Sequence, residues 1–288
     1  MIVGLKGIIQ GGVSVKDFST VTQINIGDSE DILNNFVKNG IGTFKDDFYY
    51  FEDGDKLILI DCGLGDKQSE KFFGHYHPHG DDSLEKSLSS AGFSLDDITD
   101  VFLTHLHFDH VGGAVEWNDA RDGYRPSFKN AIYWSNSRHW KWATEPNARE
   151  RASFLSENIL PLQESGQLKF VDASDDDLRV NTGLGFDAFV VNGHTDAQMC
   201  PIITTDNGKT LVFMADLLPS VGHIPVPYVM GYDTRPLLTL EERSRIFNEA
   251  ADSGYHLFLE HDSENEICTL TQTEKGPSLD NAMRLSDI

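Results

Sequence analysis

A single layered α/β domain is predicted by three features of this 288-residue sequence. Short apolar runs typical of strands alternate along the chain with segments of helical character. Neither an internal repeat nor a low-complexity linker divides the chain, so residues 1–288 are expected to form one domain. Potential metal ligands directly follow several predicted strands, and the loops after strand ends are where layered α/β proteins assemble their sites.

The first half of the chain has the pattern of short strands and short helices. Apolar or alternating runs predict strands over 21–26, 48–51, 57–60 and 101–104. Helical patterns are predicted over 82–91, 95–98 and from Gly112 onward. The strand over 101–104 is the important one, because a dense histidine cluster follows it immediately.

Residues 114–164 differ from the rest of the chain by their aromatic content. All four tryptophans fall here, at Trp117, Trp134, Trp140 and Trp142. A strand over 130–134 and helices over 135–143 and 147–160 are predicted, the last ending before Pro161. Core packing is the favoured interpretation of this aromatic insertion. The alternative is a lid or wall of a substrate pocket, since such pockets are largely apolar and aromatic.

The second half returns to short strands. Strands are predicted over 186–191, 200–205, 209–214 and 257–259, and a helix over 241–250. The Asp-Asn-Gly at 206–208 predicts a hairpin between two of these strands. Residues 274–288 are expected to be an exposed polar tail.

The densest chemical signal is the run His105-Leu106-His107-Phe108-Asp109-His110. Three imidazoles and a carboxylate within six positions are a higher density of metal-binding side chains than an ordinary protein surface requires. Neutral imidazole together with carboxylate suits zinc and similar divalent ions. Three further candidate ligands each follow a predicted strand: His194, Asp216 and His261. The sequence therefore predicts a metalloenzyme.

Charge and cysteine usage narrow the class of protein. The formal net charge is −23 and no basic stripe is visible, which argues against a nucleic-acid partner. No apolar run is long enough to cross a membrane, and no signal peptide is recognised, so a cytoplasmic location is expected. The cysteines at 62, 200 and 268 form no CxxC and are expected to be buried thiols.

The ligand pattern resembles the HxHxDH motif of the metallo-β-lactamase superfamily, followed in the family's order by His194, Asp216 and His261. Asp61, at the end of an early predicted strand, resembles the family's aspartate at that position. The similarity covers roughly residues 20–265. It implies an αββα sandwich, a single metallo-β-lactamase domain, with two divalent metal ions at one edge, zinc first and cobalt, manganese or iron as alternatives.

The resemblance also implies a role for each ligand. His105, His107 and His194 would hold one ion; Asp109, His110 and His261 would hold the other; Asp216 would bridge both. Two such ions bring the pKa of a shared water to about 7 and so provide hydroxide at neutral pH. Asp109 and Asp216 are the expected catalytic carboxylates, Asp109 by orienting the hydroxide and moving a proton.

Among the branches of the superfamily, the chain looks most like the N-acyl homoserine lactonases and methyl-parathion-type hydrolases. The expected activity is hydrolysis of a lactone or ester of a small, partly apolar molecule. Phosphotriester hydrolysis is the alternative, followed by β-lactam hydrolysis and by a non-catalytic metal-binding role. The lactonases place a tyrosine after the bridging aspartate, whereas Asp216 precedes Leu217-Leu218-Pro219; Tyr228 or His223 are candidate substitutes.

The remaining histidines are expected to have other roles. His75, His77 and His79 are interpreted as an exposed loop, and His139 and His256 as structural residues. The oligomeric state is left open, with a homodimer as one option.

Overall fold

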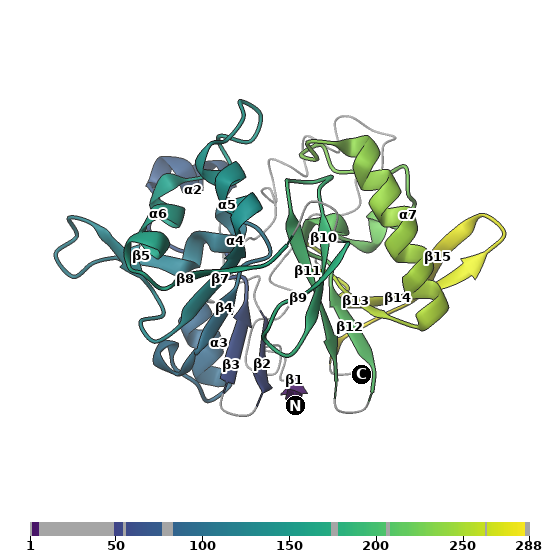
Figure 1. The fold of residues 1–288 in the computed structure, drawn as a ribbon, viewed down its shortest axis with the longest axis horizontal. Helices are drawn as coiled ribbons and strands as arrows, with labels where there is room; N and C mark the ends of the chain where they lie inside the picture. The colour runs from purple at the N-terminus through teal and green to yellow at the C-terminus, as the bar shows by residue number, and fades with distance from the viewer. Residues whose placement is uncertain are drawn as a thin grey trace.

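The computed structural model describes residues 2–5, 49–53, 56–76, 83–173, 178–205, 208–262 and 264–285. The strand predicted over 21–26, His77, His79 and the first two residues of the predicted hairpin turn, 206 and 207, lie outside the described residues. Two sheets face each other with helices on their outer sides, which confirms the predicted αββα sandwich (Figure 1).

The first sheet combines antiparallel and parallel pairing. Its described strands lie in the order β1 (Ile2–Leu5), β2 (Tyr49–Asp53), β3 (Lys56–Ile60), β4 (Asp100–Phe102), β7 (Ile132–Asn136) and β8 (Leu168–Val171). Pairing is antiparallel from β1 to β3 and parallel from β3 to β8. The carboxyl ends of β3 and β4 therefore meet at one edge of the sheet.

The second sheet is antiparallel except at one pair. Its described strands lie in the order β15 (Gly276–Met283), β14 (Ile267–Thr273), β13 (His256–Phe258), β12 (Thr210–Phe213), β11 (Gln198–Thr204), β10 (Asp187–Val191) and β9 (Arg179–Asn181). The parallel pair is β12 and β13, so the loops after these two strands emerge side by side. A small ribbon of β5 (Val115–Trp117) and β6 (Tyr124–Pro126) stands apart.

Helices cover the outer faces. Beside the first sheet are α2 (Glu70–Tyr76), α3 (Leu84–Ser90), α4 (Phe108–Val111), α5 (Ser137–Thr144) and α6 (Ser156–Glu164), and beside the second is α7 (Pro236–Ser253) (Figure 1). Short 3-10 turns complete the framework: η3 (Leu95–Asp97), η4 (Gly112–Ala114), η5 (Ala215–Leu217) and η6 (Val221–His223). No helix of the described residues is long and apolar enough to cross a membrane.

The alternation of side chains along β3 produces the layers. Leu57 and Leu59 pack with the helices on the outer face, whereas Ile58 and Ile60 pack with residues of the second sheet such as Phe213. Successive residues of a strand point to opposite faces, so one apolar run serves two hydrophobic interfaces. A third cluster joins the outer face of the second sheet to Phe247 and its neighbours on α7.

The aromatic segment 114–164 is part of this core. Its strand β7 lies between β4 and β8, and Phe128, Tyr133 and Trp140 are buried in the outer cluster of the first sheet. Core packing, the favoured interpretation, therefore describes most of these aromatic residues. Phe154 is an exception, because its ring also lies 4.7 Å from the His107 ring, centroid to centroid.

Two predicted helices are placed wrongly. The helix predicted over 147–160 begins only at Ser156, because the Asn147 side chain accepts the N–H groups of Arg149 and Glu150 and holds a turn there. That helix also continues through Pro161 instead of ending before it. No α-helix begins at Gly112 as predicted: α4 already ends at Val111, and Gly112 begins only the 3-10 turn η4, which β5 follows.

Part of the segment that was predicted to be an exposed polar tail, 274–288, is a strand. Gly276–Met283 forms β15, which pairs with β14 at the edge of the second sheet. Its polar residues fit that place, because an edge strand is paired on one side only and keeps much of its surface in water. The three cysteines are buried and free, as expected.

Candidate metal centre

The histidine cluster is delivered by the end of β4. His105 and His110 are fully buried, and His107 is 6% exposed. His107 has an extended backbone, and its carbonyl accepts the N–H groups of His110 and Val111, which starts the short helix α4. This turn brings His110 back beside His105, with ring centroids 3.9 Å apart.

The glycine pair after the cluster allows the loop that follows β3 to pack against α4. A Cβ on Gly112 would lie 2.0 Å from the Leu64 carbonyl oxygen, and one on Gly113 would lie 2.1 Å from the Cys62 carbonyl oxygen. The Cys62 N–H also donates to the His110 carbonyl at 2.7 Å. Only glycine fits such a close backbone approach, and the approach places Asp61 beside His110.

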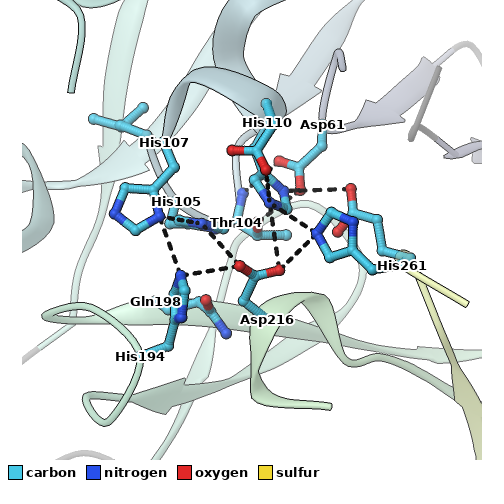
Figure 2. Close-up of polar contacts among 12 residues, drawn as sticks. Asp61, Thr104, His105, His107, His110, His194, Gln198, Asp216 and His261 are labelled. Atoms are coloured by element: carbon cyan, nitrogen blue, oxygen red, sulfur yellow. Dashed lines mark hydrogen bonds and ion pairs between the residues drawn. The ribbon is translucent and has the colours of Figure 1, made fainter. Parts of the chain in front are cut away.

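The other candidate ligands arrive from the second sheet. His194 follows β10, Asp216 lies in η5 after β12, and His261 follows β13. Glu242 of α7 fixes the His194 loop by accepting the N–H groups of Asn192 and Gly193 at 2.6 and 2.9 Å. The loops of both sheets thus meet at one edge of the sandwich (Figure 2).

One group of ligand atoms, here called the histidine-rich site, consists of His105, His107, His194 and Asp216. His107 Nδ1 lies 3.1 Å from both His105 Nε2 and His194 Nε2. Asp216 Oδ2 lies 3.0 Å from His194 Nε2 and 3.9 Å from His105 Nε2. With Zn–N bonds of about 2.0–2.1 Å, tetrahedral ligand nitrogens stand about 3.3 Å apart, so these spacings fit one divalent ion.

A second group, here called the carboxylate-rich site, surrounds the other oxygen of Asp216. Asp216 Oδ1 lies 2.8 Å from His261 Nε2 and 3.4 Å from His110 Nε2. Among the described residues, the ligand atoms of His110, Asp216, Glu260 and His261 lie within 4.8 Å of one another. Asp109 stands slightly further out, with Oδ2 3.9 Å from His110 Nε2.

The chemistry of these contacts fits metal ions better than hydrogen bonds. Asp216 Oδ1 is buried and, within the described part of the chain, has no hydrogen-bond partner, although His261 Nε2 is only 2.8 Å away. Polar atoms that lie close together without a hydrogen bond between them are typical of a metal coordination shell, in which all ligand atoms point at a common centre. Figure 2 shows the Asp216 carboxylate between His194 and His261.

Further side chains orient the histidines from behind. Thr104 Oγ1 lies 3.1 Å from His105 Nδ1, and Asp233 Oδ1 lies 3.1 Å from His194 Nδ1. Glu150 Oε1 lies 3.5 Å from His107 Nε2. Such partners fix the ring orientation and raise the basicity of a metal-binding imidazole.

His110 has two carboxylates at its outer nitrogen. Asp61 Oδ2 lies 3.0 Å from His110 Nδ1, and Glu260 Oε1 lies 3.3 Å from the same atom. Asp61 also accepts the N–H and the hydroxyl of Thr104 at 2.8 and 2.6 Å. It has a left-handed backbone with φ 55°, a strained conformation that is common at functional sites.

The electrostatic environment differs from one imidazole to the next. Burial lowers the pKa of His105 well below its usual value and also lowers that of His107. Burial likewise opposes the charged form of His110, but Glu260, Asp109 and Asp216 outweigh it and raise that pKa well above the usual value. Burial raises the pKa of Glu260 to about 8. A bound cation would reverse this by stabilising the carboxylate.

Sequence reasoning missed the outer carboxylates Glu150, Asp233 and Glu260. Glu150 and Asp233 follow no predicted strand, so no local signal marks them. Glu260 directly precedes His261, and its position beside a predicted ligand was the signal that could have found it. The predicted ligands themselves are brought together, apart from the slightly more distant Asp109.

Aromatic side chains border the site on the side of α2. The Phe108 ring lies 5.3 Å from the Phe72 ring and 4.8 Å from the Tyr76 ring, centroid to centroid. We call Phe72, Tyr76 and Phe108 the aromatic rim. Burial and the charge of the neighbouring Asp109 raise the pKa of Tyr76, so its phenol is a neutral hydrogen-bond donor. Of the expected tyrosine substitutes, Tyr228 is 56% exposed.

The remaining histidines differ from the metal ligands. His139 is buried, its Nε2 accepts the Leu106 N–H at 2.8 Å, and its Nδ1 lies 2.5 Å from the Asp196 carbonyl oxygen. Burial lowers its pKa to about 4, so it is neutral and structural. His75 is exposed, but it lies in helix α2 where a loop was expected. His223 is half-buried, with Nδ1 2.8 Å from Ser220 Oγ.

Comparison with known proteins agrees with this geometry. The family model described as metallo-beta-lactamase superfamily matches residues 46–252. A probable metal-dependent hydrolase from Staphylococcus aureus has a similar structure, with a TM-score of 0.74 over 98% of each chain at 19% identity. No curated protein sequence matches the chain.

Two further solved structures share the fold. One is AidC, a dizinc quorum-quenching lactonase in complex with the product N-hexnoyl-L-homoserine, with a TM-score of 0.65 at 23% identity over 83% of this chain and 79% of that chain. The other is hydrolase AbOPH in the beta lactamase superfamily, with a TM-score of 0.65 at 20% identity over 99% and 93%.

Proposed function

This chain belongs to the metallo-beta-lactamase superfamily, and we propose that it is a dinuclear-metal hydrolase acting on a lactone or ester of a small, partly apolar molecule. The observation that supports this most directly is the division of one carboxylate between two imidazole groups. Asp216 Oδ2 faces His194 at 3.0 Å and Oδ1 faces His261 at 2.8 Å. A carboxylate whose two oxygens face different imidazole groups is placed as one that bridges two metal ions would be.

The metal ions would be held by the two groups already described. His105, His107 and His194 would hold one ion, and His110 and His261, with Asp109, would hold the other. Asp216 would bridge the two. When bound, two divalent ions supply hydrolytic chemistry by acidifying water to a pKa of about 7 and by withdrawing electrons from a carbonyl oxygen. Imidazole-rich ligation favours zinc.

Asp109 is the residue that would move protons. Its side chain is 14% exposed, whereas that of His110 beside it is fully buried. This greater exposure supports a position of Asp109 on the side from which a substrate would arrive. Its Oδ2 would take a proton from the attacking water and return it to the leaving oxygen, which is general acid–base catalysis by one carboxylate.

The aromatic rim and the solved structures of similar fold support the proposed substrate class. Phe72, Tyr76 and Phe108 would contact the apolar part of a substrate whose reacting carbonyl lies at the metal centre. Lactonases are among the proteins of similar structure. The Tyr76 phenol would donate a hydrogen bond to the substrate, a role that no residue after Asp216 fills, because Leu217 and Leu218 are buried and apolar.

An assay series tests the proposal. Protein loaded with zinc, cobalt or manganese is incubated with N-acyl homoserine lactones of different chain length, aryl esters and a paraoxon-type triester. We expect kcat/KM for a lactone or an ester to exceed that for the triester. Absence of turnover of every lactone and ester with all three metals would contradict the proposal.

Phosphotriester hydrolysis is the second candidate. The buried Leu217 and Leu218 after Asp216 are the observation in its favour, because they leave that side of the site apolar. A triester rate far above any lactone or ester rate in the same assays would select it.

A further inference from the structure

We propose that Glu260 is an additional carboxylate ligand of the carboxylate-rich site and that it makes this site prefer oxygen-seeking cations, such as Mn²⁺, more strongly than the histidine-rich site does. This inference rests on the proposed function only in that it places an ion at His110, Asp216 and His261. It concerns which ion that position takes, and it holds or fails independently of the substrate.

The position of Glu260 indicates a ligand. Its side chain is fully buried, and apart from the 3.3 Å contact between Oε1 and His110 Nδ1 neither carboxylate oxygen has a hydrogen-bond partner among the described residues. Its ligand atom lies within 4.8 Å of those of His110, Asp216 and His261. A buried carboxylate is strongly destabilising unless a cation or hydrogen-bond donors compensate it, and a divalent ion at this group would do so.

Orienting the His110 ring is not a sufficient reason for Glu260 to lie here, because Asp61 already performs that role. Asp61 Oδ2 lies 3.0 Å from His110 Nδ1, closer than Glu260 Oε1 at 3.3 Å. Asp61 is also fixed by Thr104, which donates its N–H and hydroxyl to the two oxygens. A neutral imidazole whose other nitrogen binds a metal has one proton at Nδ1, so one acceptor suffices.

The two sites would then differ in ligand type. The histidine-rich site offers three imidazoles and Asp216, a set that suits zinc. With Glu260, the carboxylate-rich site would offer Asp109, Asp216 and Glu260 beside two imidazoles. Carboxylate oxygens favour Mn²⁺ and similar cations, whereas imidazole favours zinc, copper and iron.

Metal titration tests the inference without any substrate. Metal-free wild-type protein, Glu260→Gln and Asp61→Asn are titrated with Mn²⁺ and with Zn²⁺ by calorimetry, with bound metal measured independently. We expect Glu260→Gln to weaken the second equivalent of Mn²⁺ at least about tenfold more than that of Zn²⁺. Asp61→Asn, which acts through the His110 ring, should weaken both ions by similar factors.

If Glu260→Gln weakens the binding of both ions equally, Glu260 only positions His110 and the inference is overturned. The inference is also overturned if the second equivalent binds as tightly in Glu260→Gln as in the wild type, or if the wild-type protein binds no second ion. Glu260→Asp keeps the carboxylate and should recover part of the Mn²⁺ preference; no recovery would also count against a ligand. Circular dichroism of the metal-free variants checks that the fold is kept. Selective binding through Glu260 in a protein that hydrolyses no lactone or ester would refute the proposed function and leave this inference standing.

Discussion

The histidine-rich and carboxylate-rich sites share Asp216 but differ in burial and in surroundings. Every member of the first group is buried, and two of its imidazoles have a carboxylate behind them, Glu150 or Asp233. In the second group the side chain of His261 is 15% exposed and that of Asp109 is 14% exposed. The enclosed site is suited to retaining an ion, and the more open one to meeting the substrate, because a catalytic metal needs an open position.

The largest effect is expected from removing what the two sites share. Asp216→Asn should lower the content of both ions and reduce turnover by more than about 100-fold, since even outer-shell changes at metal sites cost 10- to 100-fold. Metal analysis and initial rates measure this. Asp187→Asn, at a partly exposed position in β10, is the matched control and should change neither. Full retention of both ions in Asp216→Asn would show that the carboxylate does not bridge.

The enclosed site can be weakened alone through its outer carboxylate. Asp233→Asn should reduce affinity for the first ion about 10- to 100-fold, because His194 loses the partner at its Nδ1. The second ion should be affected much less. Stepwise titration with a chelating competitor separates the two equivalents, and equal losses at both would show that the sites are not independent.

Metal affinity should depend on pH with a known sign. Burial opposes protonation of His194, but Asp216 and Asp233 outweigh it and raise the pKa to about 9 in the metal-free protein. At pH 7 this imidazole holds a proton that must leave before it binds metal, so affinity should rise about tenfold per pH unit for each proton released, levelling off above about pH 9. Chelator competition at several pH values measures the slope, and a flat profile from pH 7 to 9 would contradict it.

The same shift affects the metal-free fold. The pKa of His194 is higher in the folded protein than the usual value of 6.5 in the unfolded chain. Its protonation therefore stabilises the fold fully at pH values below 6.5, and this stabilisation is lost as the pH rises through about 9. Metal-free protein should therefore unfold more easily at pH 9 than at pH 6.5, as measured by urea denaturation.

The smallest effect is expected at the rim beside the open site. Tyr76→Phe should lower kcat about fivefold by removing one hydrogen bond of about 1 kcal/mol, with metal content unchanged. Tyr228→Phe is the control, because that side chain is largely exposed. A fall in bound metal in Tyr76→Phe would show a structural effect instead, and identical kinetics for both variants would remove Tyr76 from the reaction.

Prediction from sequence succeeded where the signal was local. The fold class, most strands, the helix over 135–143 and the burial of the cysteines follow from patterns within a few residues of each position. Errors arose where another part of the chain competes with the local pattern. The Asn147 turn delays α6, and pairing with β14 orders the segment after 274. Residues 21–26 and the turn at 206–207 remain predictions.

The sequence alone predicted which residues would carry the metal chemistry. His105, His107, Asp109 and His110 lie within six positions, and His194, Asp216 and His261 each follow a predicted apolar strand, so local pattern and resemblance to the family were enough to propose them. Only the tertiary structure decided how these residues are distributed between the histidine-rich and the carboxylate-rich site. Glu150, Asp233 and Glu260 reach their histidines through packing, and no sequence pattern marks that role. The environment of each imidazole, and with it the difference between the two sites, depends on burial and on neighbouring charges that only the folded chain brings together.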